Sequence, residues 1–225
     1  MCASIRTLCF PAAVLATVFF AVTPTRAGVI FSNFGTGNNA YSAADWTVSG
    51  ATSQLGQQNS SAMQFTSGTA FILTQIDVAL GWISGFNGVT LSLETSVGAL
   101  PSNVVLASWT LTGLPTLDST FSTRETVTAS LNLTAGQYWI VAAAMGSDTW
   151  AGWNENNIGQ IGDFAQTQNN VNWTLFPAAR GFNPGAFDVL STPEPATALL
   201  AASALGLLTV LRQKQRRRSR SKCKV

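Results

Sequence analysis

The sequence contains no histidine, and its three cysteines, Cys2, Cys9 and Cys223, all lie near the ends of the chain. The long middle stretch therefore has neither the imidazole nor the thiol that most often serves as general base, nucleophile or metal ligand. A Ser-His-Asp triad is impossible there. Neither a disulfide nor a thiolate-bound metal can stabilise a fold in this stretch, so packing and hydrogen bonds must do so.

Charged residues are also scarce, at 10% of the chain, and they are unevenly distributed. Between Gly28 and Leu190 nine carboxylates face only Arg124 and Arg180, which gives a net charge of 2 − 9 = −7. A nucleic-acid partner is disfavoured, because almost no cation is present there to neutralise phosphates. Carboxylates remain for acid and base chemistry, and the residual enzyme hypothesis is a glycoside hydrolase with two facing carboxyl groups.

The first 27 residues have the three parts of a secretory signal peptide. Arg6 gives a short positive region, an apolar stretch of 13 residues runs from Phe10 to Val22, and Thr25-Arg26-Ala27 is a small-x-small cleavage site. The mature chain is expected to begin at Gly28. We therefore predict an exported domain from Gly28 to Leu190, or 190 − 28 + 1 = 163 residues, which is enough for one well-packed core.

The last 35 residues, Ser191 to Val225, combine three signals in order. The motif Pro193-Glu194-Pro195 is followed by an apolar run from Ala196 to Leu211 and then by a basic tail. A helix counted from Pro193 has 211 − 193 + 1 = 19 residues, enough to cross a bilayer. The positive-inside rule predicts that the tail stays in the cytoplasm and the domain lies outside. The cations of the tail are Arg212, Lys214, Arg216, Arg217, Arg218, Arg220, Lys222 and Lys224.

This order of a P-E-P motif, a short Ala/Leu-rich helix and a terminal Arg cluster resembles the PEP-CTERM sorting signal, and a simple tail anchor is the alternative. The resemblance implies export through the inner membrane of a Gram-negative bacterium, transient anchoring by the C-terminal helix, and processing near Pro193-Glu194-Pro195 by an exosortase. It also implies delivery to the cell surface or its exopolysaccharide matrix. The implied partners are the exosortase and the export machinery.

The domain between the two signals is predicted to be all-β. Apolar and polar residues alternate over Ile72–Leu80, Val89–Glu94 and Thr126–Leu133, whereas Gln137–Met145 is apolar on both faces, as in a central strand. Further strand candidates are Val29–Phe34, Asp45–Ser49, Ala62–Phe65, Val104–Leu111, Val171–Phe176 and Phe187–Leu190. No segment has a sustained helical period, so the pattern favours an antiparallel β-sandwich with a jelly-roll-like architecture.

Part of the domain carries a second, looser pattern of spacing. The stretch Gln64–Gly113 contains a V-x-L-x-L strand at Val89–Leu93, a G-x-L-P-S turn at Gly98–Ser102 and the sequence V-L-A-S-W at Val105–Trp109. This arrangement resembles choice-of-anchor passenger domains, type R in particular. The resemblance implies a sandwich and an envelope location, and it brings no activity or site residue with it.

The richest set of candidate binding residues is aromatic. Trp150, Trp153 and Trp173 lie in a stretch rich in Asn and Gln, with Asn154 and Glu155 beside them. Indole faces stack on sugar rings while amides and carboxylates bond hydroxyl groups, so these five residues are interpreted as a shallow carbohydrate-binding platform on an exposed loop. The alternative is that the three tryptophans belong to the core, as is expected of the four other tryptophans.

No metal or cofactor is predicted. The segment Gly35–Ala40 has the spacing of a dinucleotide fingerprint, but no helical pattern follows it, so it is interpreted as a turn. An oxygen-rich stretch from Asp148 to Asp163 fails the EF-hand spacing and is interpreted as a solvated loop. The competing functions are therefore a non-enzymatic exported envelope protein, a carbohydrate-binding module and a carboxylate-dependent glycoside hydrolase.

Overall fold

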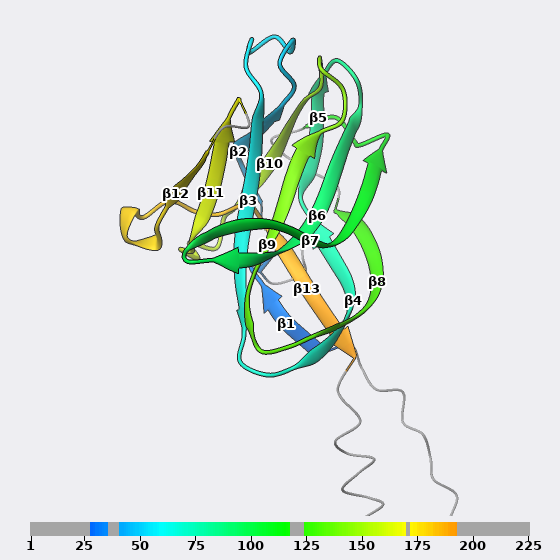
Figure 1. Cartoon of the computed structure of the whole chain (residues 1–225). Helices are drawn as coiled ribbons and strands as arrows, with labels where there is room; N and C mark the ends of the chain where they lie inside the picture. Colours follow the sequence, from blue (N-terminus) through cyan, green and yellow to red (C-terminus); the bar gives the residue numbers. More distant parts are fainter. Residues whose placement is uncertain (1–27, 36–40, 118–123, 170–171, 193–225) are drawn as a thin grey trace, which may run out of the picture.

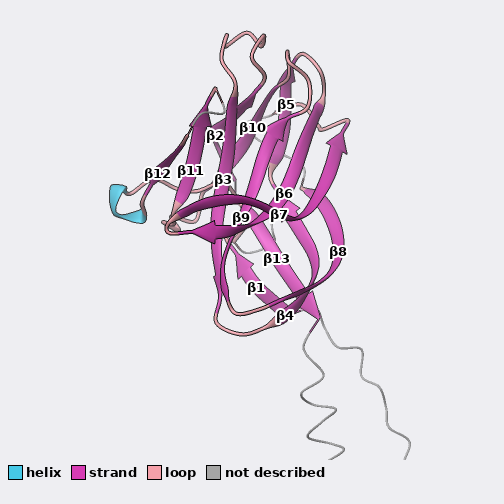
Figure 2. Ribbon diagram, in the orientation of Figure 1, coloured by secondary structure: helices cyan, strands magenta, loops and turns pink. Residues whose placement is uncertain are grey.

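The computed structural model describes residues 28–35, 41–117, 124–169 and 172–192 (Figure 1). Within these ranges the chain has thirteen β-strands, one short 3₁₀ turn at Ala178–Arg180 and no α-helix (Figure 2). Every pairing between neighbouring strands is antiparallel. The predicted all-β, antiparallel class is confirmed.

The strands form two sheets. The four-stranded sheet has the order β1-β13-β4-β8, and the larger sheet has the order β5-β10-β2-β3-β9-β6-β7, with β11 paired to β3 and β12 paired to β11. The strands of the smaller sheet are β1 (Gly28–Ser32), β13 (Phe187–Thr192), β4 (Phe71–Val78) and β8 (Glu125–Leu133). Those of the larger sheet are β5 (Leu80–Ser84), β10 (Trp150–Asn156), β2 (Tyr41–Ser49), β3 (Asn59–Ser67), β9 (Gly136–Ala144), β6 (Gly88–Val97), β7 (Leu100–Thr112), β11 (Phe164–Gln168) and β12 (Trp173–Phe176).

The two sheets share one main hydrophobic core, in a sandwich-like arrangement. Ile76 and Val78 of β4 pack in the same cluster as Leu91 and Leu93 of β6 and Ile140 of β9, and all five side chains are fully buried. Their spacing of two residues along each strand places them on one face, because successive side chains of a strand point to opposite sides. The alternation seen in the sequence therefore marks the faces that the two sheets turn toward each other.

The strand β9 is buried on both faces, as its uninterrupted apolar sequence predicts. Tyr138, Ile140 and Ala142 face the main core, while Trp139 and Val141 belong to a second, smaller cluster on the other side. This second cluster also contains Ala62, Ala165, Leu100, Trp173 and Leu175. Residues from β11, β12 and the beginning of β7 therefore cover the outer face of β9.

The first and last described strands are neighbours. In the pairing of β1 with β13, Gly28 lies opposite Ser191 and Ser32 lies opposite Asp188. The chain therefore enters β1 and leaves β13 at the same end of the molecule, at the lower side of Figure 1.

The stretch from Trp150 onward differs from the prediction. It was expected to be an exposed loop, but it forms β10, an inner strand hydrogen-bonded to both β5 and β2. The small residues explain this placement: a side chain added at Gly152 would come within 2.6 Å of Asp45 Oδ1 and 2.9 Å of Leu117 Cδ2. Gly152 therefore permits a close approach in a packed sheet and does not mark a turn.

The predictions about both ends of the chain concern residues outside those described. They are the signal peptide (residues 1–27), the motif Pro193-Glu194-Pro195, the apolar helix and the basic tail with Arg212, Lys214, Arg216, Arg217 and Arg218. Within the described ranges, no helix combines the length and the apolar character that crossing a bilayer would require.

Candidate functional site

The predicted aromatic platform is wrong for two of its five residues. Trp153 is fully buried, its Nε1 donates a hydrogen bond to the carbonyl oxygen of Ala186 at 2.9 Å, and its ring packs edge-on against Phe187 with centroids 6.3 Å apart. Asn154 is only 1% exposed, and its side-chain amide donates to the carbonyl oxygen of Ser42 at 3.0 Å. Both residues are occupied inside the protein because β10 is an inner strand.

The other three residues are half-buried and lie apart. Trp150 begins β10, and its Nε1 is buried without a hydrogen-bond partner among the described residues. Trp173 begins β12, where its Nε1 lies 3.5 Å from Asn103 Oδ1. In the sheet, β2, β3 and β11 separate β10 from β12. Burial raises the pKa of Glu155, and the nearby charge of Asp45 raises it further.

A different aromatic cluster lies where β2 meets β11 and β12. The ring of Trp46 contacts that of Phe164 at a centroid distance of 4.0 Å, and Phe164 stacks on Phe176 at 4.8 Å with an interplanar angle of 6°. Phe182 meets all three rings edge-on at 6.1 to 6.4 Å and is itself 45% exposed. Trp46 is held from the other end, because its Nε1 donates to the carbonyl oxygen of Asn183 at 2.8 Å.

A shallow groove of about 280 Å³ adjoins this cluster and runs along β3, β11 and β12. Two of its glutamine side chains are fixed by hydrogen bonds: Gln166 Nε2 donates to Ser61 Oγ at 3.0 Å, and Gln168 Nε2 donates to Gln57 Oε1. Neither glutamine Oε1 has a hydrogen-bond partner among the described residues. The lining residues are Asn59, Gln166, Thr167, Gln168, Thr174 and Phe176.

The register of the strands explains why these side chains share one face. Gln166 lies opposite Ser61 of β3 on one side and Thr174 of β12 on the other, and Phe164 lies opposite Phe176. Residues two apart on a strand point the same way, so the glutamines follow Phe164 along one face of β11. The sequence signal was the alternation of Phe164, Gln166 and Gln168, but it could be recognised only once its partner strands were known.

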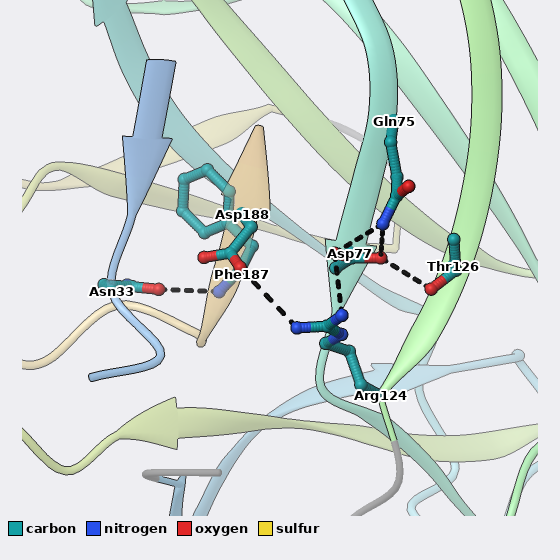
Figure 3. Close-up of polar contacts among 7 residues, drawn as sticks. All are labelled: Asn33, Gln75, Asp77, Arg124, Thr126, Phe187 and Asp188. Atoms are coloured by element: carbon teal, nitrogen blue, oxygen red, sulfur yellow. Dashed lines mark hydrogen bonds and ion pairs between the residues drawn. The ribbon is translucent and has the colours of Figure 1, made fainter. Parts of the chain in front are cut away.

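A buried group of charged residues lies on the smaller sheet (Figure 3). Asp188 of β13 lies directly opposite Asp77 of β4 in the pairing of these two strands, and the two residues are 3% and 0% exposed. Arg124 reaches both carboxylates, at 3.4 Å from Asp77 Oδ2 and 3.8 Å from Asp188 Oδ2. Asp77 also accepts hydrogen bonds from Thr126 Oγ1 at 2.5 Å and from Gln75 Nε2, which lies 2.9 Å from each carboxylate oxygen.

This arrangement is suited to holding strands together. Burial raises the pKa of Asp188; a hydrogen bond from Ser32 lowers it, the charge of Asp77 raises it and the guanidinium of Arg124 lowers it. Nearby, Asn33 fixes the end of β1, because its Oδ1 accepts a hydrogen bond from the backbone N–H of Phe187 at 2.6 Å. Since a cation already lies between the two carboxylates, we interpret the group as a structural ion network.

The oxygen-rich residues between Asp148 and Asp163 are also used locally. Asp148 Oδ1 accepts a hydrogen bond from the backbone N–H of Phe86 at 3.2 Å, and Asp163 Oδ1 accepts one from that of Ala178 at 2.8 Å. Over the described part of the chain, no group of three or more acidic side chains is arranged to hold a metal ion. These residues order separate loops.

Comparison of the chain with models of known protein families finds no match, and neither does a search of curated proteins. The groove beside Phe176 is thus identified by its own geometry and chemistry. It joins an aromatic ring to uncharged hydrogen-bonding groups, and its volume is slightly below the range of small-molecule sites, which begins at about 300 Å³.

Proposed function

We propose that the chain is an exported, non-enzymatic protein of the bacterial cell envelope, delivered by a PEP-CTERM-type signal to the cell surface or its exopolysaccharide matrix. The observation that carries the proposal is the pairing of the first described strand with the last. Gly28, the expected first residue of the mature chain, lies opposite Ser191, which is two residues before Pro193. The described chain therefore begins and ends at adjacent positions, and in the sequence each of these is within two residues of an expected processing site.

This placement suits a domain that is held by one end. A membrane helix beginning at Pro193 would continue from β13, so the sheets would extend away from the membrane and the groove residues would stay accessible. Removal of a signal peptide before Gly28 would leave a free N-terminus at the same end. The stretch from Gly28 to Leu190 contains no cysteine, so packing and hydrogen bonds must stabilise the domain without a disulfide.

We further propose that the sandwich is a jelly roll. Eight strands carry this pattern, in chain order β1, β3, β4, β6, β7, β8, β9 and β13. If these eight strands are counted from one to eight in chain order, the smaller sheet, β1-β13-β4-β8, has the order 1-8-3-6. The run β3-β9-β6-β7 of the larger sheet then has the order 2-7-4-5. This interleaving is what two Greek keys produce in a jelly roll. The other strands are then additions to the larger sheet.

The proposal is tested by expressing the full chain in a Gram-negative host with and without its exosortase. Intact mass spectrometry of surface material should find Gly28 at the N-terminus and no basic tail when the exosortase is present. Without the enzyme, the chain should remain in the inner-membrane fraction with Val225 in place.

A variant pair separates sorting from anchoring. Glu194→Ala should retain the chain in the inner membrane despite the exosortase, whereas the matched change Thr192→Val should be sorted normally. If surface material from the exosortase-positive host carries an intact Val225, a simple tail anchor is the better account and the sorting proposal fails.

A further inference from the structure

The groove on β3, β11 and β12 offers the two kinds of contact that a sugar ring uses. Phe176 supplies a half-buried aromatic side chain at one part of the groove, and Gln166 and Gln168 supply amides at another. The pyranose ring has apolar C–H faces and a rim of hydroxyl groups, so an aromatic side chain beside amides matches both.

The aromatic contact is held rigidly before any ligand arrives. Phe164 is 1% exposed and its ring lies parallel to that of Phe176, so the orientation of Phe176 is fixed from below by a core residue. Trp46 in turn packs on Phe164. A site whose side chains are already ordered loses less conformational entropy on binding.

The amides are also oriented in advance. Gln166 and Gln168 each use an N–H to bond a neighbouring side chain, which fixes the plane of the amide while its carbonyl oxygen remains without a partner among the described residues. The two residues lie two apart on β11, so their side chains are spaced about 6.8 Å along the strand. This row of oriented acceptors is suited to hydroxyl donors that are spread along an extended ligand.

The charge of the domain favours neutral over acidic glycans as ligands of the groove. The lining of the groove contains no ionisable side chain, and the stretch from Gly28 to Leu190 has a net charge of −7. A polyanionic chain would be repelled by this domain. Arg180, whose Cζ lies 5.9 Å from the ring centroid of Phe176, is the one cation found near the groove among the described residues, and its N–H groups can also donate to hydroxyl oxygens.

From these observations we propose that the groove lined by Gln166, Gln168, Thr174 and Phe176 is a binding site for a neutral polysaccharide. Phe176, whose ring is stacked on Phe164 and has Arg180 over it, gives the sugar an apolar contact beside these two side chains, and the two glutamines bind hydroxyl groups. The inference goes beyond export and sorting and does not depend on them, because binding is measured on the isolated protein.

The test is affinity electrophoresis of the full chain in detergent micelles, with dextran, laminarin and galactomannan as neutral probes and alginate as an acidic probe. At least one neutral probe should retard the protein, and alginate should not. Gln166→Ala and Gln168→Ala should each weaken the affinity for the polysaccharide that retards the parent protein about three- to tenfold, because each removes one hydrogen bond to the ligand.

Matched variants exclude a loss of folding as the cause. Gln54→Ala, at an exposed position in the loop between β2 and β3, should bind as the parent does. Phe176→Leu keeps an apolar side chain but removes the aromatic ring, and this variant should also lose binding. The melting temperature of every variant is recorded, so that a loss of folding is recognised. The proposal is overturned if no neutral probe retards the protein, if alginate alone does, or if the glutamine variants bind as Gln54→Ala does.

Discussion

Replacing Arg124 by Met should strongly destabilise the domain while leaving the groove intact. Arg124 is the shared cation of Asp77 and Asp188, which are directly opposite each other on neighbouring strands. Without the guanidinium, two buried carboxylates face each other and neither can be hydrated. Methionine is chosen because it keeps much of the apolar volume of the arginine stem.

The expected loss is about 3 kcal/mol in the free energy of unfolding. Removing one partner of a buried ion pair typically costs about 3 to 5 kcal/mol, because the remaining charge is left uncompensated. The lower end applies here, since the Arg124 side chain is 29% exposed and solvent screens part of its interaction. Thr126 and Gln75 still donate to Asp77 in the variant, which limits the loss further.

Urea unfolding at pH 7 measures the loss, and a second substitution tests its cause. Adding Asp188→Asn to Arg124→Met removes one of the two facing charges and should recover roughly half of the lost stability, while Asp188→Asn alone should cost less than Arg124→Met. If Arg124→Met stays within about 0.5 kcal/mol of the parent, as an ordinary surface change does, the ion network does not stabilise these strands.

Two further predictions concern the core and the pH dependence. Trp153→Ala should cost about 3 to 5 kcal/mol, because it leaves a large cavity and an unpaired carbonyl, whereas Trp150→Ala should cost clearly less; equal losses in urea unfolding would contradict the difference in burial. The folded state should become more stable as the pH falls from 7 toward the ordinary pKa values of 3.8 for Asp and 4.5 for Glu. A carboxyl group whose pKa is raised by folding binds its proton more tightly in the folded than in the unfolded chain, so the gain accrues as the pH falls through the raised pKa values. A melting temperature that falls over this interval would refute the second prediction. The carboxyl groups with raised pKa are Asp45, Glu94, Glu125, Glu155 and Asp188.

The strands that could be predicted are those whose two faces differ in polarity or are both apolar. Val89–Glu94 became β6 and Gln137–Met145 became β9, because burial on one or both faces is directly visible as a sequence period. β10 and β11 were missed because they contain Asn, Gln and Gly. Polar residues of β10 can be buried because they find partners inside the protein: Asn156 Nδ2, for example, donates to the carbonyl oxygens of Gln160 and Pro184, both at 3.0 Å.

The tryptophans show why composition alone misplaced the site. Trp153 is accommodated in the core because Gly185, 32 positions further along the chain, leaves room for the indole: a Cβ there would lie 2.6 Å from the ring. The groove has the same dependence on distant residues, since Gln166 meets Ser61 across 105 positions. No local pattern encodes either contact.

Several contacts between segments far apart in the sequence involve β13, the strand that precedes the predicted membrane helix. β13 lies between β1 and β4, so it is hydrogen-bonded on both edges. Phe187 stacks on Phe31 at 4.4 Å and makes a T-shaped contact with Trp153, and Asp188 pairs with Arg124. If the chain is held through residues that follow Thr192, any pull on the tether enters the domain at β13. An edge strand without a disulfide would detach there, whereas an inner strand fixed by ring stacking and an ion network transmits the load to both neighbours. Under the proposed tether, the buried ions and the paired ends of the domain would lie on the strand that carries the load.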